Sequence, residues 1–180
     1  IVEDLMSLSR IEADRFVTPR DHVSLEEIAR IAAENGRPLA EARGCRILVE
    51  AEPELPPIAG DFAQLLQLTD NLVANAIRYG CGPADCVVTI RAARDDGNAL
   101  LTVSDTGDGI PPEHLPRLTE RFYRIDAARS RDAGGTGLGL AIVKHIVERH
   151  RGSLEIKSAP GRGTEVTVRL AFAADQPAPS

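Results

Sequence analysis

Hydrophobic residues along the 180-residue sequence recur at two spacings, the 3.6-residue period of helices and the two-residue period of strands. The helical spacing predicts helices over residues 1–16, 24–39, 61–79 and 137–150. The alternating spacing predicts strands over residues 45–51, 87–93, 99–105, 153–158 and 164–172. The chain therefore mixes helices with strands, and most of its strands follow one another in pairs.

Short turns join the strand pairs. Asp-Asp-Gly-Asn at residues 95–98 is a hairpin signal, and Pro-Gly-Arg-Gly at residues 160–163 is a second turn. The predicted fold class is α/β, as an α+β two-layer sandwich in which a mixed, mostly antiparallel sheet packs against about three helices. A doubly wound parallel sheet fits less well, because it needs a helix between successive strands.

The N-terminal helix presents a narrow apolar stripe formed by Ile1, Leu5, Leu8 and Ile11. A helix this short is marginal alone, so we expect it to pack against a helix of the same or another chain; the alternative is a frayed amphipathic end. The predicted organisation is this helix over residues 1–16, a linker over residues 17–22, a domain over residues 23–172 and a disordered tail over residues 173–180.

Composition and charge exclude several function classes. The 43% hydrophobic content suffices for one core. The net charge of −6 is spread along the chain and argues against nucleic-acid binding, which needs clustered Lys and Arg. No apolar run reaches about eighteen residues, so we expect no membrane contact. The sequence starts at Ile1 without a signal-like segment, and we expect a cytoplasmic fragment of a longer protein.

The sequence contains three cysteines, Cys45, Cys81 and Cys86. Their number is odd, and their spacing is not that of a zinc finger. We therefore expect reduced cytosolic thiols and no disulfide.

The helix over residues 61–79 carries polar residues at helical spacing within an apolar pattern. Asn71, Asn75, Arg78 and Tyr79 fall along one side, because residues three and four apart share a helix face. An amide oxygen suits a hard cation such as Mg²⁺, and a guanidinium suits phosphate oxygens. This face predicts a metal–nucleotide site; the alternative is an amide-rich helix that only caps loops.

Two glycine-containing segments offer complementary chemistry. Asp105 ends a strand beside Gly107 and Gly109, where a carboxylate can accept a hydrogen bond from an exocyclic amine such as adenine N6, although a plain Asp-Gly turn has the same sequence. Residues 134–140 run into a helix, whose N-terminal amides can bind phosphate. The long intervening loop carries Arg121 and Arg124, which suit a closing lid, although solvated arginines are the commoner case.

In this order, the motifs resemble those of the catalytic ATP-binding domain of bacterial sensor histidine kinases. The similar segments are residues 71–79 (N box), 105–109 (first glycine box), 121–124 (F box), 135–139 (second glycine box) and 161–164 (last glycine box). The resemblance covers residues 23–172, while residues 1–16 are similar to the end of the second helix of the dimerisation and phosphotransfer hairpin. The amino-acid sequence of residues 118–140 is most similar to that of kinases of the phosphate-regulon sensor type.

The resemblance implies roles for individual residues, with ATP and Mg²⁺ as cofactors. Asn75 would ligate Mg²⁺, and Arg124 would contact the γ-phosphate, so both are expected to be catalytic. Asp105 would select adenine through N6, with Thr164 assisting through a water. The implied nucleotide-binding set is Asn71, Arg78, Tyr79, Asp105, Gly107, Gly109, Ile110, Gly135, Thr136, Gly137, Leu138, Gly139, Leu140 and Thr164.

One feature of the family is missing. Its phosphoacceptor is a His followed by an acidic or polar residue on the first hairpin helix, and none of His22, His114, His145 and His150 has that context. The expected partners are therefore an acceptor His on an absent dimerisation domain, a response regulator and, in the full-length protein, a second copy of the chain. Any inner-membrane anchor would lie in missing N-terminal segments.

Two other functions remain open, an ATP-binding module without transfer activity and a gyrase-type ATPase. In the related ATPases a Glu one helical turn before the metal-binding Asn acts as general base, and here that position is Asn71. Because an amide cannot take up a proton at neutral pH, we expect slow hydrolysis and phosphotransfer to histidine.

Overall fold

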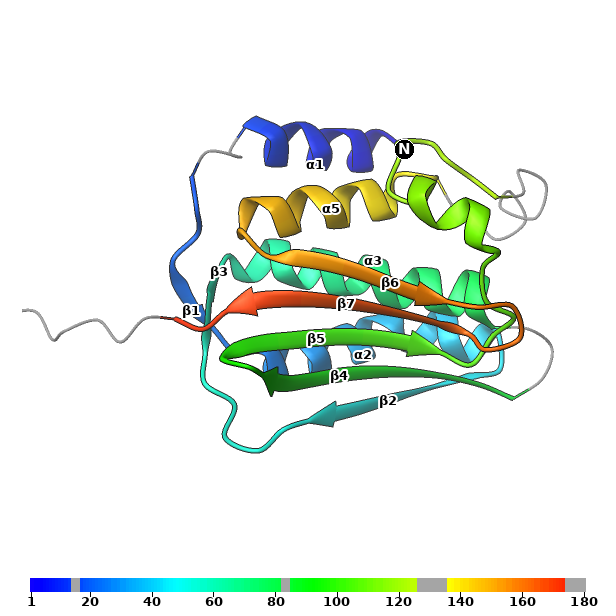
Figure 1. The fold of residues 1–180 in the computed structure, drawn as a ribbon, viewed down its shortest axis with the longest axis horizontal. Coiled ribbons are helices and arrows are strands. Elements are labelled where there is room, and N and C mark those ends of the chain that lie inside the picture. The colour runs from blue at the N-terminus through cyan, green and yellow to red at the C-terminus, as the bar shows by residue number, and fades with distance from the viewer. Residues whose placement is uncertain (14–16, 82–84, 126–135, 174–180) are drawn as a thin grey trace, which may run out of the picture.

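The computed structural model describes residues 1–13, 17–81, 85–125 and 136–173. Its centre is a five-stranded sheet in the order β2 (Cys45–Ala51), β4 (Cys86–Asp95), β5 (Asn98–Asp105), β7 (Thr164–Ala171) and β6 (Ser153–Ser158). Three helices, α2 (Leu25–Ala42), α3 (Phe62–Gly80) and α5 (Gly139–Arg149), cover one face of this sheet (Figure 1). The predicted two-layer arrangement is confirmed.

The sheet is mixed, as predicted. β2 and β4 run parallel, while the β4–β5, β5–β7 and β6–β7 pairs are antiparallel. The β4–β5 hairpin turns through Asp96 and Gly97, which have φ values of 50° and 82°. Two consecutive residues with positive φ are typical of a type I′ turn, which Asp-Gly favours.

A second, two-stranded sheet was not predicted. β1 (Asp21–Val23) pairs antiparallel with β3 (Ile58–Gly60), and Ile58 also bridges to Phe172. Asp21 and His22, the last two residues of the predicted linker, thus belong to a short strand. Strands of three residues are too short to produce a recognisable alternation, so their pairing depends on contacts made elsewhere in the fold.

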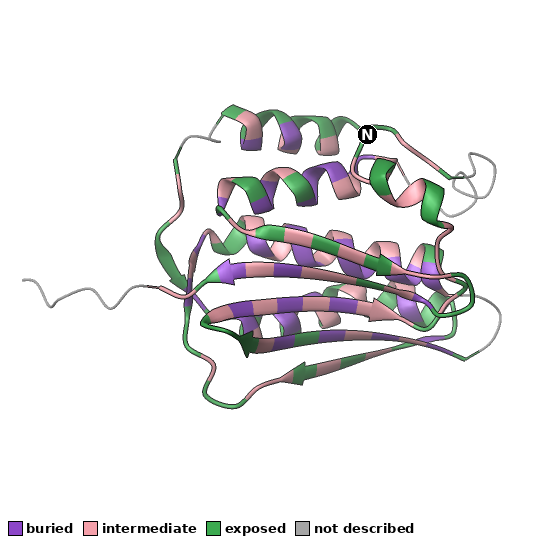
Figure 2. Ribbon diagram, in the orientation of Figure 1, coloured by how far each residue is buried: buried purple, intermediate pink, exposed green. Residues whose placement is uncertain are grey.

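Side-chain caps begin the two long helices where the sequence indicates. The Ser24 side chain accepts a hydrogen bond from Glu27 N at 3.2 Å, and Asp61 accepts one from Gln64 N at 3.0 Å. Each cap satisfies a backbone N–H that has no partner within the helix. Figure 2 shows buried residues along α3, which lies behind the sheet in this view. Leu65 and Ile77 of this helix are fully buried. Each such side chain contributes about 1.5–3 kcal/mol by leaving water.

The N-terminal helix α1 (Val2–Ala13) packs against α5 of the same chain. Leu8 and Ile11 are buried there, whereas Val2 and Met6 remain exposed. Of the two packing partners that the apolar stripe allowed, the structure contains the intramolecular one. None of the helices in the described ranges combines the length and the apolar character needed to cross a membrane.

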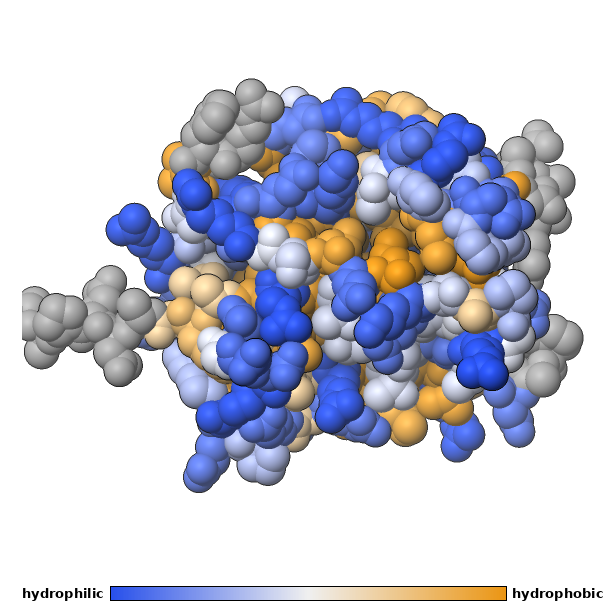
Figure 3. Space-filling model, viewed as in Figure 1, coloured by the Kyte–Doolittle hydropathy of each residue, from blue (hydrophilic) through white to orange (hydrophobic). Residues whose placement is uncertain are grey.

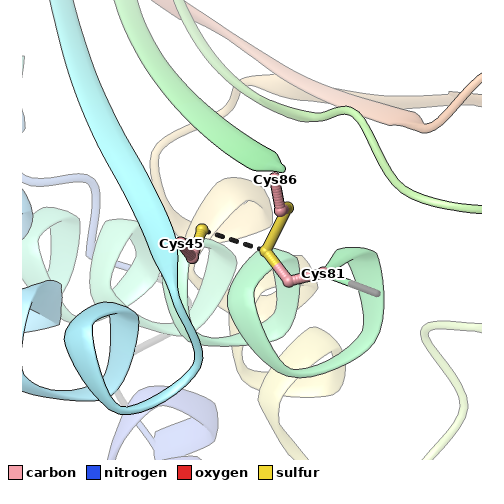
Figure 4. Close-up of side chains that lie close together, drawn as sticks. All are labelled: Cys45, Cys81 and Cys86. Atoms are coloured by element: carbon pink, nitrogen blue, oxygen red, sulfur yellow. Dashed lines mark hydrogen bonds between the residues drawn. A yellow bond between two sulfur atoms is a disulfide. The ribbon is translucent and has the colours of Figure 1, made fainter. Parts of the chain in front are cut away.

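The prediction of three reduced cysteines is wrong. Cys81, directly after α3, forms a disulfide with Cys86, the first residue of β4, and Cys45 is a buried free thiol (Figure 4). The Cα atoms of the pair lie 5.2 Å apart, within the range that a disulfide spans. The two cysteines are only five residues apart, but the odd cysteine count and the lack of zinc-finger spacing gave no reason to pair them.

Candidate functional site

A cavity of about 830 Å³ lies between α2, α3, the start of α5 and the ends of β5 and β7. Thirteen of the predicted site residues line it: Asn71, Asn75, Arg78, Tyr79, Asp105, Gly109, Ile110, Arg124, Thr136, Gly137, Gly139, Leu140 and Thr164. They come from segments far apart in the sequence. Gly107 and Leu138 do not line the cavity, and Gly135 lies outside the described residues.

The polar face of α3 forms one wall of the cavity. Asn71, Asn75 and Arg78 point to it, while Leu72 and Ile77 on the opposite side are buried in the core. Asn71 Nδ2 and Arg78 Nε are buried and lack a hydrogen-bond partner among the described residues. Leaving a buried donor unpaired costs about 1–3 kcal/mol, so these two atoms indicate that a ligand with acceptor atoms binds here.

Asp105 lies at the end of β5 and is the register partner of Thr164 on β7, so the two predicted residues are neighbours. Its carboxylate accepts a hydrogen bond from Gly107 N at 3.0 Å. Burial raises the pKa of Asp105 above its usual range, although backbone hydrogen bonds from Gly107 and Thr164 lower it. The carboxylate is thus partly desolvated, which strengthens its hydrogen bonds to any ligand.

Gly107 shapes the cavity from outside it. A Cβ on Gly107 would lie 1.8 Å from the backbone oxygen of Gly80 at the end of α3. Gly107 therefore lets two backbone segments pack closely together, although it does not itself line the cavity. Leu138 is fully buried in the core, and its N–H donates to Thr136 Oγ1 at 3.3 Å.

The segment after Ile110 closes another side of the cavity. It begins with the 3₁₀ helix η1 (Pro112–Arg117). His114 Nδ1 lies 2.5 Å from Tyr123 Oη, and the Arg117 guanidinium stacks over the Tyr123 ring at 4.3 Å from the centroid. These contacts fix the tyrosine, which lines the cavity next to Arg124. Arg124 Nε is a third buried donor without a hydrogen-bond partner in the described part of the chain.

The base of the long loop is joined by a backbone contact. Phe122 N donates to Gly137 O at 2.9 Å, so the chain on either side of residues 126–135 meets there. Helix α1 contacts both sides as well, since Arg121 pairs with Glu12, and Thr136 Oγ1 donates to Asp4 Oδ2 at 3.0 Å. Of the predicted lid, which runs from about Pro111 to Thr136, residues 126–135 lie outside the described residues.

Several cavity residues were not predicted. They are Asp4, Ala32, Asn35, Gly36, Leu39, Asp70, Pro111, Leu118, Tyr123, Ile125, Ile156 and Val166, among others. Asn35 Nδ2 donates to both oxygens of Asp70 at 3.3 Å, and burial raises the pKa of Asp70 while this hydrogen bond lowers it. Asp70 precedes Asn71, which was a usable signal, but Asn35 is brought to the site only by the packing of α2 on α3.

A smaller hollow of about 470 Å³ lies between η1, α5 and β6, and it shares Ile156 with the lining of the larger cavity. Leu115, Pro116, Leu154 and Ile156 contribute to its lining. Figure 3 shows hydrophobic surface over β6 and the neighbouring part of α5. None of the residues predicted to bind nucleotide lines this hollow.

Comparisons with known proteins bear on the larger cavity. A family model for histidine kinase-, DNA gyrase B- and HSP90-like ATPases matches residues 60–174. The phosphate regulon sensor protein PhoR of Pseudomonas aeruginosa is 41% identical over 171 residues, which are 95% of this chain and 38% of that protein. The sensor-like histidine kinase SenX3 of Mycolicibacterium smegmatis is 36% identical, over 94% of this chain and 44% of that protein. The chain thus spans less than half of either relative.

Solved structures agree with these matches. Full-length ShkA in complex with AMPPNP superposes with a TM-score of 0.83 at 28% identity, covering 98% of this chain and 36% of that one. The mycobacterial sensor histidine kinase MprB gives a TM-score of 0.68 at 28% identity, covering 85% of this chain and 97% of that one. The fold that contains the cavity is therefore that of histidine kinase structures.

Proposed function

The chain belongs to the family of histidine kinase-, DNA gyrase B- and HSP90-like ATPases, and on that premise we propose that it is the catalytic domain of a sensor histidine kinase. It binds ATP with Mg²⁺ in the larger cavity and transfers the γ-phosphate to a histidine of a dimerisation domain outside this sequence. The observation that carries the proposal is the set of three unpaired donors, Asn71 Nδ2, Arg78 Nε and Arg124 Nε, around one cavity.

These donors suit a polyphosphate. Phosphate oxygens accept hydrogen bonds and carry negative charge, so they satisfy buried guanidinium N–H groups more fully than a neutral ligand does. Arg78 comes from α3 and Arg124 from the segment after η1, so the two cations approach the cavity from different elements. We assign Arg78 to the phosphate chain and Arg124 to the γ-phosphate.

Asn75 is the proposed Mg²⁺ ligand. Its amide lies beside Gly139 at the start of α5, where a Cβ would come within 3.6 Å of Nδ2 and 3.7 Å of Oδ1. Both distances are ordinary van der Waals contacts, and Asn75 itself lines the cavity, so its amide stands at the cavity wall beside the first turn of α5. When bound, Mg²⁺ supplies charge neutralisation between phosphate oxygens.

The adenine end is proposed to lie at Asp105. Its partly desolvated carboxylate accepts from the exocyclic amine, and Thr164 on the adjacent strand stands next to it. Thr164 Oγ1 is held 2.9 Å from Ser158 Oγ, which also accepts from Ile110 N at 2.7 Å. This hydroxyl network fixes the segment that contains Gly109 and Ile110, while Tyr79 borders the base from α3.

We propose phosphotransfer to histidine, and not ATP hydrolysis, because the residue at position 71 is an asparagine. The Asn71 amide cannot remove a proton from water, whereas a neutral acceptor imidazole already carries a lone pair. Asp70 is a carboxylate in the same cavity, but both of its oxygens accept from Asn35 Nδ2. We assign Asp70 a positioning role between α2 and α3.

The remaining parts of the proposal follow from the family. Helix α1 corresponds to the end of the second hairpin helix, residues 23–172 to the catalytic domain, and the phosphoryl group passes on to a response regulator. The full-length protein acts as a homodimer, and any membrane anchor lies outside this sequence. The binding of AMPPNP to ShkA supports an adenine nucleotide as the ligand of this fold.

A phosphotransfer assay tests the proposal. The chain is incubated with labelled ATP, Mg²⁺ and a separately purified hairpin domain of a related sensor kinase that bears the acceptor histidine. Acid-labile phosphate on the hairpin, with little phosphate release when the hairpin is omitted, is the expected result. Nucleotide binding without any transfer would favour the ATP-binding module, and fast release without the hairpin would favour the gyrase-type ATPase. Asn71→Glu should raise the release rate, since it restores a base at that position.

A further inference from the structure

The three cysteines converge from three elements (Figure 4). Cys45 begins β2, Cys86 begins β4, and these two residues are register partners in the parallel β2–β4 pair. Cys81 follows the last residue of α3. All three Sγ atoms lie within 4.8 Å of one another, although the residues are spread over the sequence.

The free thiol faces the disulfide. Cys45 Sγ lies 3.0 Å from Cys81 Sγ, and Cys81 is bonded to Cys86, so Cys81 is the central sulfur of the three. Cys45 and Cys86 are buried and Cys81 is half-buried, which leaves the central sulfur the most accessible. A thiol this close to one sulfur of a disulfide is at the distance from which exchange starts. Because all three Sγ atoms lie within 4.8 Å of one another, the three sulfurs form a bent line. The Cys45 side chain must therefore rotate before it can attack Cys81 Sγ in line with the Cys81–Cys86 bond.

We propose that Cys45, Cys81 and Cys86 form a thiol–disulfide exchange site whose pairing influences the adenine end of the cavity. The Cys45 thiolate attacks Cys81 Sγ, the Cys45–Cys81 bond forms and the Cys81–Cys86 bond breaks. Cys86 leaves as a thiolate and takes up one proton, which replaces the proton lost by Cys45. The step needs no external oxidant or reductant, because one disulfide and one thiol are present before and after it.

Burial raises the pKa of Cys45, against a hydrogen bond from the Val88 backbone that lowers it, and the Asp105 carboxylate raises it further. Little Cys45 thiolate therefore exists at neutral pH. Uncatalysed disulfide rearrangement takes minutes to hours, and a buried thiol belongs at the slow end of that range. The two pairings are thus separable in time, which makes the exchange measurable.

The coupling to the cavity runs through Gly80, and it rests on the nucleotide function proposed above. Gly80 precedes Cys81 and lies against the Asp105 carboxylate, where an added Cβ would be 2.2 Å from Cγ. The Cys81–Cys86 disulfide ties the end of α3 to β4, whereas a Cys45–Cys81 disulfide ties it to β2. Because Gly80 lies directly against the Asp105 carboxylate, a change in the position of Gly80 changes the space around that carboxylate.

Thiol mapping tests the exchange. The 180-residue chain is purified without reductant, incubated at pH 8 for increasing times, denatured in excess N-ethylmaleimide and mapped by mass spectrometry. The expected label starts mainly on Cys45 and becomes divided between Cys45 and Cys86. Label that stays on Cys45 alone after a day, label on Cys81, or label on all three residues would each overturn the proposal.

Two locked variants test the coupling. Cys45→Ser retains only the Cys81–Cys86 pairing, and Cys86→Ser permits only Cys45–Cys81. Oxidised Cys86→Ser is expected to bind ATP several-fold more weakly than oxidised Cys45→Ser, while the two variants bind alike after reduction. Equal affinities in the oxidised state would overturn the coupling. If neither variant nor the parent binds ATP, the proposed nucleotide function fails, while the labelling experiment still decides the exchange.

Discussion

Replacing Asp105 by Asn isolates the proposed contact with adenine. The two side chains have the same shape, and the Asn Oδ1 atom can still accept from Gly107 N, so the β5 end should keep its conformation. The substitution removes the charge and places a donor where the carboxylate could only accept. Loss of one charge-assisted hydrogen bond costs about 1.5–3 kcal/mol, which is roughly a 10- to 150-fold loss of ATP affinity.

Stability should respond differently from affinity. Burial raises the folded-state pKa of Asp105 above its ordinary value, so the ionised form is disfavoured by folding. A group with a raised folded-state pKa contributes stability below its unfolded pKa and loses that contribution as pH rises through the folded value. At neutral pH Asp105→Asn should therefore leave the free energy of unfolding unchanged or slightly increase it, since no desolvated charge remains.

Titration with ATP and GTP, alongside urea unfolding at pH 7, measures both quantities. Asp108→Asn is the matched control, because Asp108 is an exposed carboxylate in the same segment and does not line the cavity. The ATP-to-GTP affinity ratio should fall for Asp105→Asn and stay at the parent value for Asp108→Asn. An unchanged ratio in a folded Asp105→Asn protein would refute the assignment of the adenine contact.

Three further perturbations follow from the same geometry. Asn75→Ala should abolish the stabilisation of the fold by Mg-ATP, while the melting temperature of the free protein should fall by no more than a few degrees. Asn98→Ala, outside the cavity, is the control. If Mg-ATP still stabilises Asn75→Ala, the metal role is excluded. Arg124→Ala should slow phosphotransfer at least tenfold while changing ADP affinity little, and equal losses in both assays would place Arg124 elsewhere on the nucleotide. Burial lowers the pKa of His150, so the stability that this residue contributes should be lost as pH falls below about 6.5. The free energy of unfolding in urea should therefore differ less between pH 7.5 and pH 5.5 for His150→Gln than for the parent.

Much of the fold could be predicted because its signals are local. The β4–β5 hairpin follows from Asp-Gly between alternating segments, and the caps at Ser24 and Asp61 mark helix starts that the structure confirms. The β1–β3 pair could not be predicted, since neither strand contains enough residues to show a period. It forms where the chain before α2 meets the chain before α3, which is a property of the tertiary arrangement.

The walls of the cavity were predictable where one element carries several site residues, as α3 does, and not where a wall comes from helix packing. Gly36 on α2 illustrates the difference. A Cβ there would lie 2.9 Å from Val73 Cγ1 and 3.2 Å from Ile47 Cδ1, so the glycine lets α2 approach α3 and β2 closely. That approach brings Asn35 to Asp70. In the sequence, Gly36 reads only as a weak point in a helix.

Gly80 shows how the predicted motifs depend on one another. The sequence pattern treats it as the end of α3, but the structure places it against the Asp105 carboxylate and against the backbone of Gly107. A side chain at either glycine would overlap these groups. The last turn of α3 and the loop after β5 can therefore lie this close together only when both positions are glycine. Tyr79 and Asp105, which lie on different elements, are thereby held at one end of the cavity. The spacing between the motifs is consequently required for packing as well as for ligand binding. Gly80→Ala should therefore weaken nucleotide binding at the adenine end more than it destabilises the core.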